Sequence, residues 1–184
     1  GPAPHARRVE ALTASARARI EDGDLEGGVA QMERAANEAE QVLGAQSPMV
    51  GFMLQSIVPY ELELGRLNSA DEHSAAGLRL LAASLRPGTF PYEAAAAARA
   101  AVLLARGELG EAAALLDGAT ATFRRLLGTS SDAFIAAEAN RIQILARSGA
   151  IDRAAPAAVA LESASGAAPL HLRMRVARLG AEVR

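Results

Sequence analysis

A short glycine turn recurs four times at one spacing, and this repetition constrains the fold more than any other feature of the chain. Each turn consists of a glycine, a variable residue and an aliphatic residue, and the glycines are 42 residues apart: Gly23, Gly65, Gly107 and Gly149. Leu43, Leu85 and Leu127 keep the same interval. Such a period predicts an array of similar supersecondary units, which presents a long surface rather than a pocket for chemistry.

Small residues form a third marker with the same period, at Ala35, Gly77 and Ala119, where we expect a neighbouring helix to approach closely. Between the markers the apolar residues follow helical periodicity, as in Leu109, Ala112 and Leu116. Glycine suits the turn because the first helix ends there near the left-handed conformation. Each repeat is therefore predicted to hold two antiparallel helices.

The sequence predicts an all-α chain of nine helices. Their expected ranges, each uncertain by a few residues, are 5–21, 25–43, 48–64, 67–85, 91–106, 109–127, 132–147, 151–164 and 169–183. They group into hairpins at about 5–43, 48–85, 91–127 and 132–164, followed by a capping helix at 169–183. The opening Gly1-Pro2 without a methionine is typical of a cleaved expression tag, so we expect residues 1–4 to be a disordered remnant and 5–184 to form one solenoid.

Composition excludes several classes of function. The net charge of −2 lacks the cationic field that nonspecific nucleic-acid binding needs, and the absence of cysteine excludes disulfides and thiolate zinc sites. The three histidines are far apart and show no ligand spacing, so we expect no metal and no cofactor. No phosphate loop, nucleophile elbow or metalloprotease motif is present, which predicts a protein that is not an enzyme. No apolar run is long enough to cross a bilayer, so we expect a cytoplasmic protein without membrane insertion.

The third repeat carries the clearest family motif. The run from Gly107 to Ala112, with Leu116 and Ala119 behind it, resembles the tetratricopeptide repeat (TPR) in the 42-residue form of kinesin light chains and many bacterial signalling proteins. The segment 43–50 similarly resembles the leucine-glycine…proline-x-valine junction of that form. HEAT and armadillo repeats have similar lengths, but the glycine-x-leucine turn followed by a small residue favours the TPR. The resemblance implies a right-handed superhelical solenoid.

Some positions depart from the family pattern. Arg99 and Arg141 stand where an apolar residue is usual, and Pro156 lies inside a predicted helix. Pro59 lies late in another helix, where a kink could widen the groove locally.

The resemblance implies that the first helix of each hairpin lines a concave groove that binds a protein or peptide partner. Counting back ten, nine, six and two residues from the turn glycines gives one helical face. The candidate groove residues are Gln55, Ser56, Pro59, Glu63, Ala97, Ala98, Ala101, Ala105, Ala139, Asn140, Gln143 and Arg147. Asn140 matches the family's groove asparagine, whose amide can donate to and accept from a bound backbone. The alternative is a tightly wound superhelix whose groove is narrow or filled.

We expect a non-catalytic interaction scaffold, the TPR portion of a larger bacterial signalling or regulatory protein, that binds a peptide or helix in this groove. One alternative is a domain that senses a small molecule and controls an attached effector. The other is a homo-oligomerisation module with exposed apolar edges such as Leu78, Leu81 and Leu85.

Two further features of the sequence have plain structural explanations. Asp71, Glu72 and His73 are predicted to form a solvated helix face, and Glu61 and Glu63 to lie on different faces without forming a carboxylate pair. The basic amphipathic segment 170–184 is expected to shield the open end of the solenoid, with contact to a membrane surface or nucleic acid as the alternative.

Overall fold

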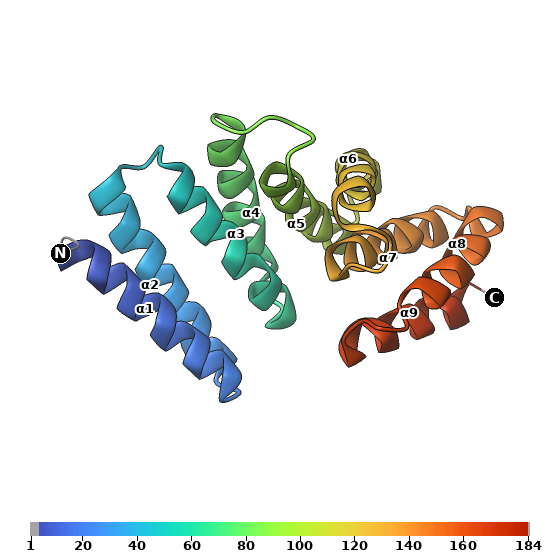
Figure 1. Ribbon diagram of the computed structural model, residues 1–184, viewed down its shortest axis with the longest axis horizontal. Helices are drawn as coiled ribbons and strands as arrows, with labels where there is room; N and C mark the ends of the chain where they lie inside the picture. Colours follow the sequence, from blue (N-terminus) through green and yellow to red (C-terminus); the bar gives the residue numbers. More distant parts are fainter. Residues whose placement is uncertain (1–3, 184) are drawn as a thin grey trace. The chain divides into compact units, whose positions relative to one another are not determined.

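The computed structural model describes residues 4–183, and within this range the chain holds nine α-helices and no strand, as the periodicity predicts (Figure 1). In chain order they are α1 (Pro4–Glu21), α2 (Leu25–Leu43), α3 (Pro48–Glu63), α4 (Leu67–Ala82), α5 (Phe90–Arg106), α6 (Leu109–Leu127), α7 (Asp132–Arg147), α8 (Ile151–Ala164) and α9 (Leu170–Glu182). Of the residues expected to be a tag remnant, 1–3 lie outside the described part and Pro4 is the first residue of α1.

The predicted helix ends agree with the structure to within one residue, except at the end of α4. That helix ends at Ala82 rather than at residue 85. The N–H of Ser84 bonds to Leu81 O at 3.1 Å, an i to i−3 bond that tightens the last turn. Pro87 follows, and because it lacks an N–H and restricts the residue before it, the helix cannot continue into the connector.

The repeated turn glycines adopt the backbone conformation that their positions predict. Gly107 has φ +87° and its N–H bonds to Leu104 O at 3.1 Å, which closes the end of α5. The φ of Gly23, Gly65 and Gly149 is also positive. Side chains strain this region of backbone space, so glycine is required for conformation rather than for lack of room.

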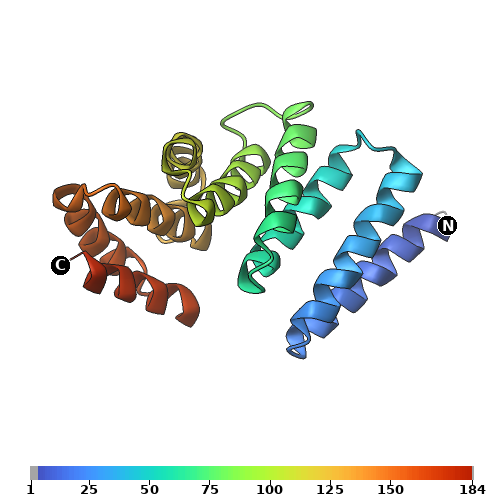
Figure 2. The same cartoon turned by 180° about the vertical axis from the view of Figure 1, so that it is seen from behind.

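The chain divides into two compact units, the first ending at Arg86 and the second beginning at Pro87. In the first unit α1 pairs with α2 and α3 with α4, and both views show α1 and α2 side by side (Figure 1 and Figure 2). Its core includes two small clusters, around Val29 with Ile57 and around Val50 with Leu80. In the second unit α5 pairs with α6 and α7 with α8, and one large cluster runs from Ala100 to Val183.

The small-residue marker coincides with close helix packing, as predicted. Ala35, Gly77 and Ala119 are all buried. A Cβ atom on Gly77 would lie 2.7 Å from Nε2 and 2.9 Å from Cγ of Gln55, so a larger residue there would displace the Gln55 side chain. The missing side chain leaves room for the hydrogen bond from Gln55 to Ser74 O, which links α3 to α4.

Candidate functional site

A cleft of about 270 Å³ opens between the two first helices of the first unit, α1 and α3. It is lined by Thr13, Arg17, Ile20 and Glu21 of α1, Met32 of α2, and Ser56 and Tyr60 of α3. Ser56 belongs to the predicted groove. Thr13, Arg17 and Glu21 stand ten, six and two residues before Gly23, so they occupy the equivalent positions on α1.

The cleft exists because α1 and α3 stand apart. In the described part of the chain each of these helices packs against α2, and the two do not pack against each other. Met32 lies between them and is half-buried, as are Ile20 and Tyr60. These three side chains give the cleft apolar walls, and methionine is an adaptable surface for an incoming apolar group.

The hydroxyl groups of Thr13 and Ser56 donate to carbonyl oxygens of their own helices. Thr13 Oγ1 donates to Val9 O at 2.9 Å, and Ser56 Oγ donates to Met53 O at 2.7 Å. Arg17 and Glu21, four residues apart on α1, are both exposed and place opposite charges beside the cleft. The cleft therefore combines an apolar interior with a polar rim.

Of the other predicted groove residues of α3, two are exposed and one forms a hydrogen bond within the fold. Pro59 and Glu63 are exposed, and α3 continues as one helix through Pro59. Gln55 donates from Nε2 to Ser74 O at 2.9 Å, while its Oε1 is buried without a hydrogen-bond partner. Gln55 thus links α3 to α4 and does not point into a free groove.

In the second unit the predicted polar groove residues are mostly engaged within the fold. Asn140 is only 8% exposed, and its Oδ1 accepts from Arg175 of α9. Arg147 donates from Nη1 to Leu104 O at 2.6 Å, which ties α7 to α5. Ala139 is fully buried.

The remaining predicted positions of the second unit are Ala97, Ala98, Ala101 and Gln143, which are half-buried, and Ala105, which is exposed. The first helices are in direct contact here, α5 with α7 and α7 with α9. The arrangement agrees with the narrow or filled groove that the sequence left open as an alternative.

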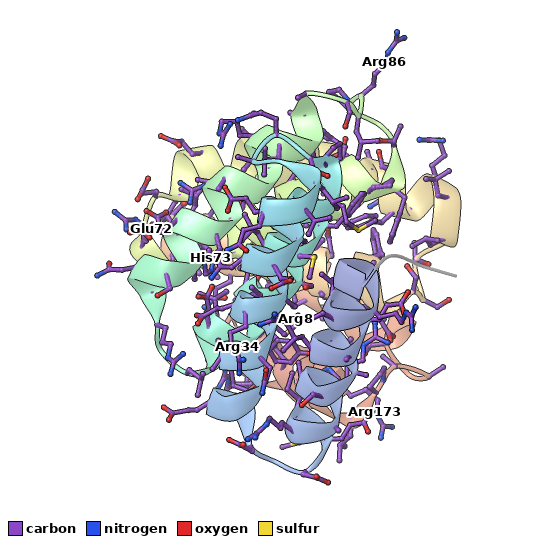
Figure 3. All side chains as sticks on the ribbon, turned by 90° about the vertical axis from the view of Figure 1, so that its left-hand side faces the viewer. Arg8, Arg34, Glu72, His73, Arg86 and Arg173 are labelled. Atoms are coloured by element: carbon purple, nitrogen blue, oxygen red, sulfur yellow. The ribbon has the colours of Figure 1, made fainter. Side chains whose placement is uncertain are left out.

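A hydrogen-bonded glutamate–histidine pair that the sequence did not predict lies in the α3–α4 hairpin. Glu61 is completely buried and its Oε1 is 2.9 Å from Nδ1 of His73, whose side chain is 25% exposed. His73 therefore does not belong to a solvated face with Glu72, which projects outward from α4 (Figure 3). Burial raises the pKa of Glu61, and the charge and hydrogen bond of His73 oppose that rise. Glu63 is exposed, so the two glutamates lie on different faces as expected.

Two other sequence interpretations need correction or explanation. Leu81 is completely buried and Leu78 and Leu85 are half-buried, so these leucines do not form the exposed edge proposed for self-association. Arg141 is compatible with α7 because its guanidinium bonds to the nearly buried carboxylate of Glu138, with Nε to Oε2 at 2.8 Å. This hydrogen bond, which outweighs the effect of burial, raises the pKa of Arg141.

A second cleft of about 230 Å³ lies on the second unit, near the α6–α7 connector and α8. Its lining residues are Arg124, Thr129, Phe134, Glu138, Ala157, Ala160, Leu161 and Ala164. The guanidinium carbon of Arg124 stands 5.3 Å from the centre of the Phe134 ring, a cation–π distance. This cleft lies away from the predicted groove residues.

Between residues 4 and 183, no group of three or more His, Asp or Glu side chains could hold a metal ion. No helix in that same range has both the length and the apolar character that a bilayer crossing requires.

Solved structures share this architecture. The repeats of a predicted kinesin light chain of Podosopora anserina, described as nearly identical and TPR-like, superpose with a TM-score of 0.74 at 16% identity, over 96% of this chain and 85% of that one. A point variant of the same protein gives 0.77 at 16% identity, over 99% and 87%. BtubC (BKLC) of P. vanneervenii gives 0.68 at 14% identity, over 98% and 85%.

No family model matches the sequence, and no curated protein matches it. At these low identities the structural similarity defines the fold, and the chain is a TPR-like helical repeat.

Proposed function

We propose that the chain is a non-catalytic protein-interaction module and that the α1–α3 cleft receives an apolar side chain of a bound peptide or helix. The observation that carries the proposal is the coincidence of the cleft with the repeat register. Thr13, Arg17, Glu21 and Ser56 all occupy groove positions counted from a turn glycine, and all line the same cleft. In the first unit, these groove positions therefore border a cleft that a partner can enter.

The size of the cleft suits one large side chain. The cleft holds about 270 Å³, near the lower end of the roughly 300–1,000 Å³ typical of small-molecule sites. Its apolar walls suit one large apolar anchor, and the charges of Arg17 and Glu21 can pair with polar groups on either side of that anchor. This mode of recognition requires no catalytic group. We extend the proposal to a role as the binding portion of a larger bacterial signalling or regulatory protein.

The test uses two variants with the same substitution. Peptides are selected from a random display library on the unmodified chain, and their affinities are measured by fluorescence anisotropy. Ser56→Trp should fill the cleft and weaken binding by about tenfold or more, which corresponds to about 1.4 kcal/mol.

Ser163→Trp is the matched control. Ser163 is exposed on α8, and its hydroxyl also donates to a carbonyl of its own helix, Val159 O at 3.2 Å. Selected peptides should bind this variant as they bind the unmodified chain. Equal binding to all three proteins would show that the cleft is not the site.

A further inference from the structure

α9 presents two different faces. Leu172, Val176, Leu179 and Val183 are buried in the core of the second unit. Another side of the helix carries His171, Met174, Arg175 and Arg178, which line an open cleft of about 450 Å³. Their spacing of i, i+3, i+4 and i+7 is that of a seam which one helix presents to another.

The seam includes unusually exposed apolar surface. Met174 is 64% exposed and Leu170, one turn earlier on the same side, is 62% exposed. Among the large apolar residues in the described range these two are the most exposed. Exposed apolar groups surrounded by charge mark interaction surfaces more often than scattered single residues do.

Within residues 4–183, Arg175 forms no salt bridge with a carboxylate. Burial and the neighbouring charge of Arg178 both lower its pKa. Its guanidinium donates to Asn140 Oδ1, a neutral amide oxygen, and no carboxylate in the described part of the chain forms a salt bridge with it. Since a guanidinium has five donors, most of its hydrogen-bonding capacity is unused. A partly buried, uncompensated charge of this kind favours the arrival of an anion.

Arg178 is only weakly neutralised. Its Nε is 3.7 Å from Oε1 of Glu182, and both side chains are mostly exposed. An exposed pair four residues apart on a helix contributes little and exchanges readily with another carboxylate. Arg175 lies one turn before Arg178, so two arginines flank the exposed face around Met174.

We propose that this face of α9 binds a helix of another protein whose contact surface combines carboxylates with an apolar side chain. The carboxylates pair with Arg175 and Arg178 through charge-assisted hydrogen bonds, and the apolar side chain covers Met174. Charge complementarity identifies the acidic partner, and the helical seam identifies its secondary structure. The site is separate from the α1–α3 cleft, so the proposal does not depend on the function proposed above.

The probe is a fluorescent, end-capped amphipathic peptide that carries Glu at positions i and i+4 and Leu at position i+3. The control peptide is identical except that Gln replaces both Glu residues. Binding to the unmodified chain is measured by anisotropy at low and moderate salt. The variant Arg178→Glu reverses one charge of the seam and should weaken binding of the Glu peptide by tenfold or more. Arg173→Glu makes the same charge change at an exposed α9 residue outside the cleft lining, and should change binding less than threefold.

The outcomes separate the possible occupants. The proposal holds if the Glu peptide binds, the Gln peptide binds at least tenfold more weakly, and only Arg178→Glu impairs binding. Equal losses with Arg178→Glu and Arg173→Glu would indicate nonspecific attraction and overturn it. Light scattering that shows a dimer for the unmodified chain and a monomer for Arg178→Glu would identify a second copy as the occupant and also overturn it.

Discussion

In the second unit the first helices of successive hairpins pack on one another, whereas in the first unit they stand apart. α7 contacts both α5 and α9, while α1 and α3 each pack on α2 and not on each other, and the cleft between them is lined by Met32 of α2. The side chains differ at equivalent positions: six residues before the turn glycine, α5 has Ala101 where α1 has Arg17 and α3 has Pro59. Small residues allow helices to close on one another, and large ones hold a cleft open. The same repeat register therefore produces a packed face in one unit and an accessible one in the other.

The largest expected effect is a loss of stability that is confined to the core of the second unit. Phe123 is nearly buried in the single cluster of the second unit, and its ring centre is 5.6 Å from that of Phe90. Phe123→Ala should lower the free energy of unfolding by about 3–5 kcal/mol, measured by urea denaturation. Hydrogen exchange should locate the lost protection in residues 90–183, the range of the second unit's helices and core cluster. Leu126→Ala, at an exposed position of α6, is the control and should change little; equal losses of protection in both units would contradict separate cores.

The second prediction compares one groove position in the two units. Asn140 and Ser56 both stand nine residues before a turn glycine, yet Asn140 is buried and Ser56 is exposed. Asn140→Leu removes the acceptor of Arg175 and should destabilise the chain by about 1–3 kcal/mol in thermal unfolding. Ser56→Leu should stay within about 0.5 kcal/mol. If both variants behaved alike, the two faces would not differ as described.

The third prediction concerns the close α3–α4 packing. A Cβ on Gly51 would lie 3.0 Å from Leu80 Cβ and 3.1 Å from Gly77 O, so Gly51→Ala should cost about 1–3 kcal/mol. Gly110→Ala in α6 meets nothing within 4 Å and should stabilise by about 0.4–1 kcal/mol. Chemical denaturation measures the free energy of unfolding of both variants. If Gly51→Ala were stabilising, α3 and α4 would not be as closely packed as described.

The smallest effect depends on pH. The raised pKa of Glu61 means that the folded state holds the proton more tightly than the unfolded chain does. Its contribution to stability is full below the ordinary value of 4.5 and is lost as pH rises through the raised value. Glu61→Gln should therefore resemble the unmodified chain in acid and gain thermal stability relative to it toward neutrality.

Three charged groups act on Glu61: the charge of His73 of α4 and that of Arg66 oppose the rise in its pKa, and the charge of Glu33 of α2 adds to it. The exposed Glu63→Gln is the control and should show no such trend. A stability difference of the opposite sign at neutral pH would show that the interaction of Glu61 with His73 outweighs the cost of burial.

The sequence predicted the helices well because their ends carry local chemistry. Turn glycines fix the hairpins, and Ser47 before Pro48 caps the start of α3, where the Ser47 side-chain oxygen accepts from Met49 N at 3.3 Å. The end of α4 was misplaced because Leu85 keeps the repeat spacing while the glycine that follows Leu43 and Leu127 is replaced there by Arg86. The repeat spacing alone therefore misplaces a helix end where the terminating glycine is missing.

The candidate site was less predictable because its accessibility depends on contacts between distant residues. Arg175 covers Asn140 from 35 positions away, and nothing in the spacing of either residue reveals the pair. His73 reaches Glu61 across a hairpin. The α1 side of the cleft could have been found, because counting back from Gly23 as from the other glycines gives Thr13, Arg17 and Glu21.

Tyr60, which lines the α1–α3 cleft, also gives the molecule an optical label. The chain has no tryptophan and two tyrosines, Tyr60 in the first unit and Tyr92 in the second. Excitation of the phenols therefore reports on one position in each unit, without attached dyes. Replacing Tyr60 by phenylalanine leaves Tyr92 alone, so the difference between the two emission spectra follows what enters the cleft.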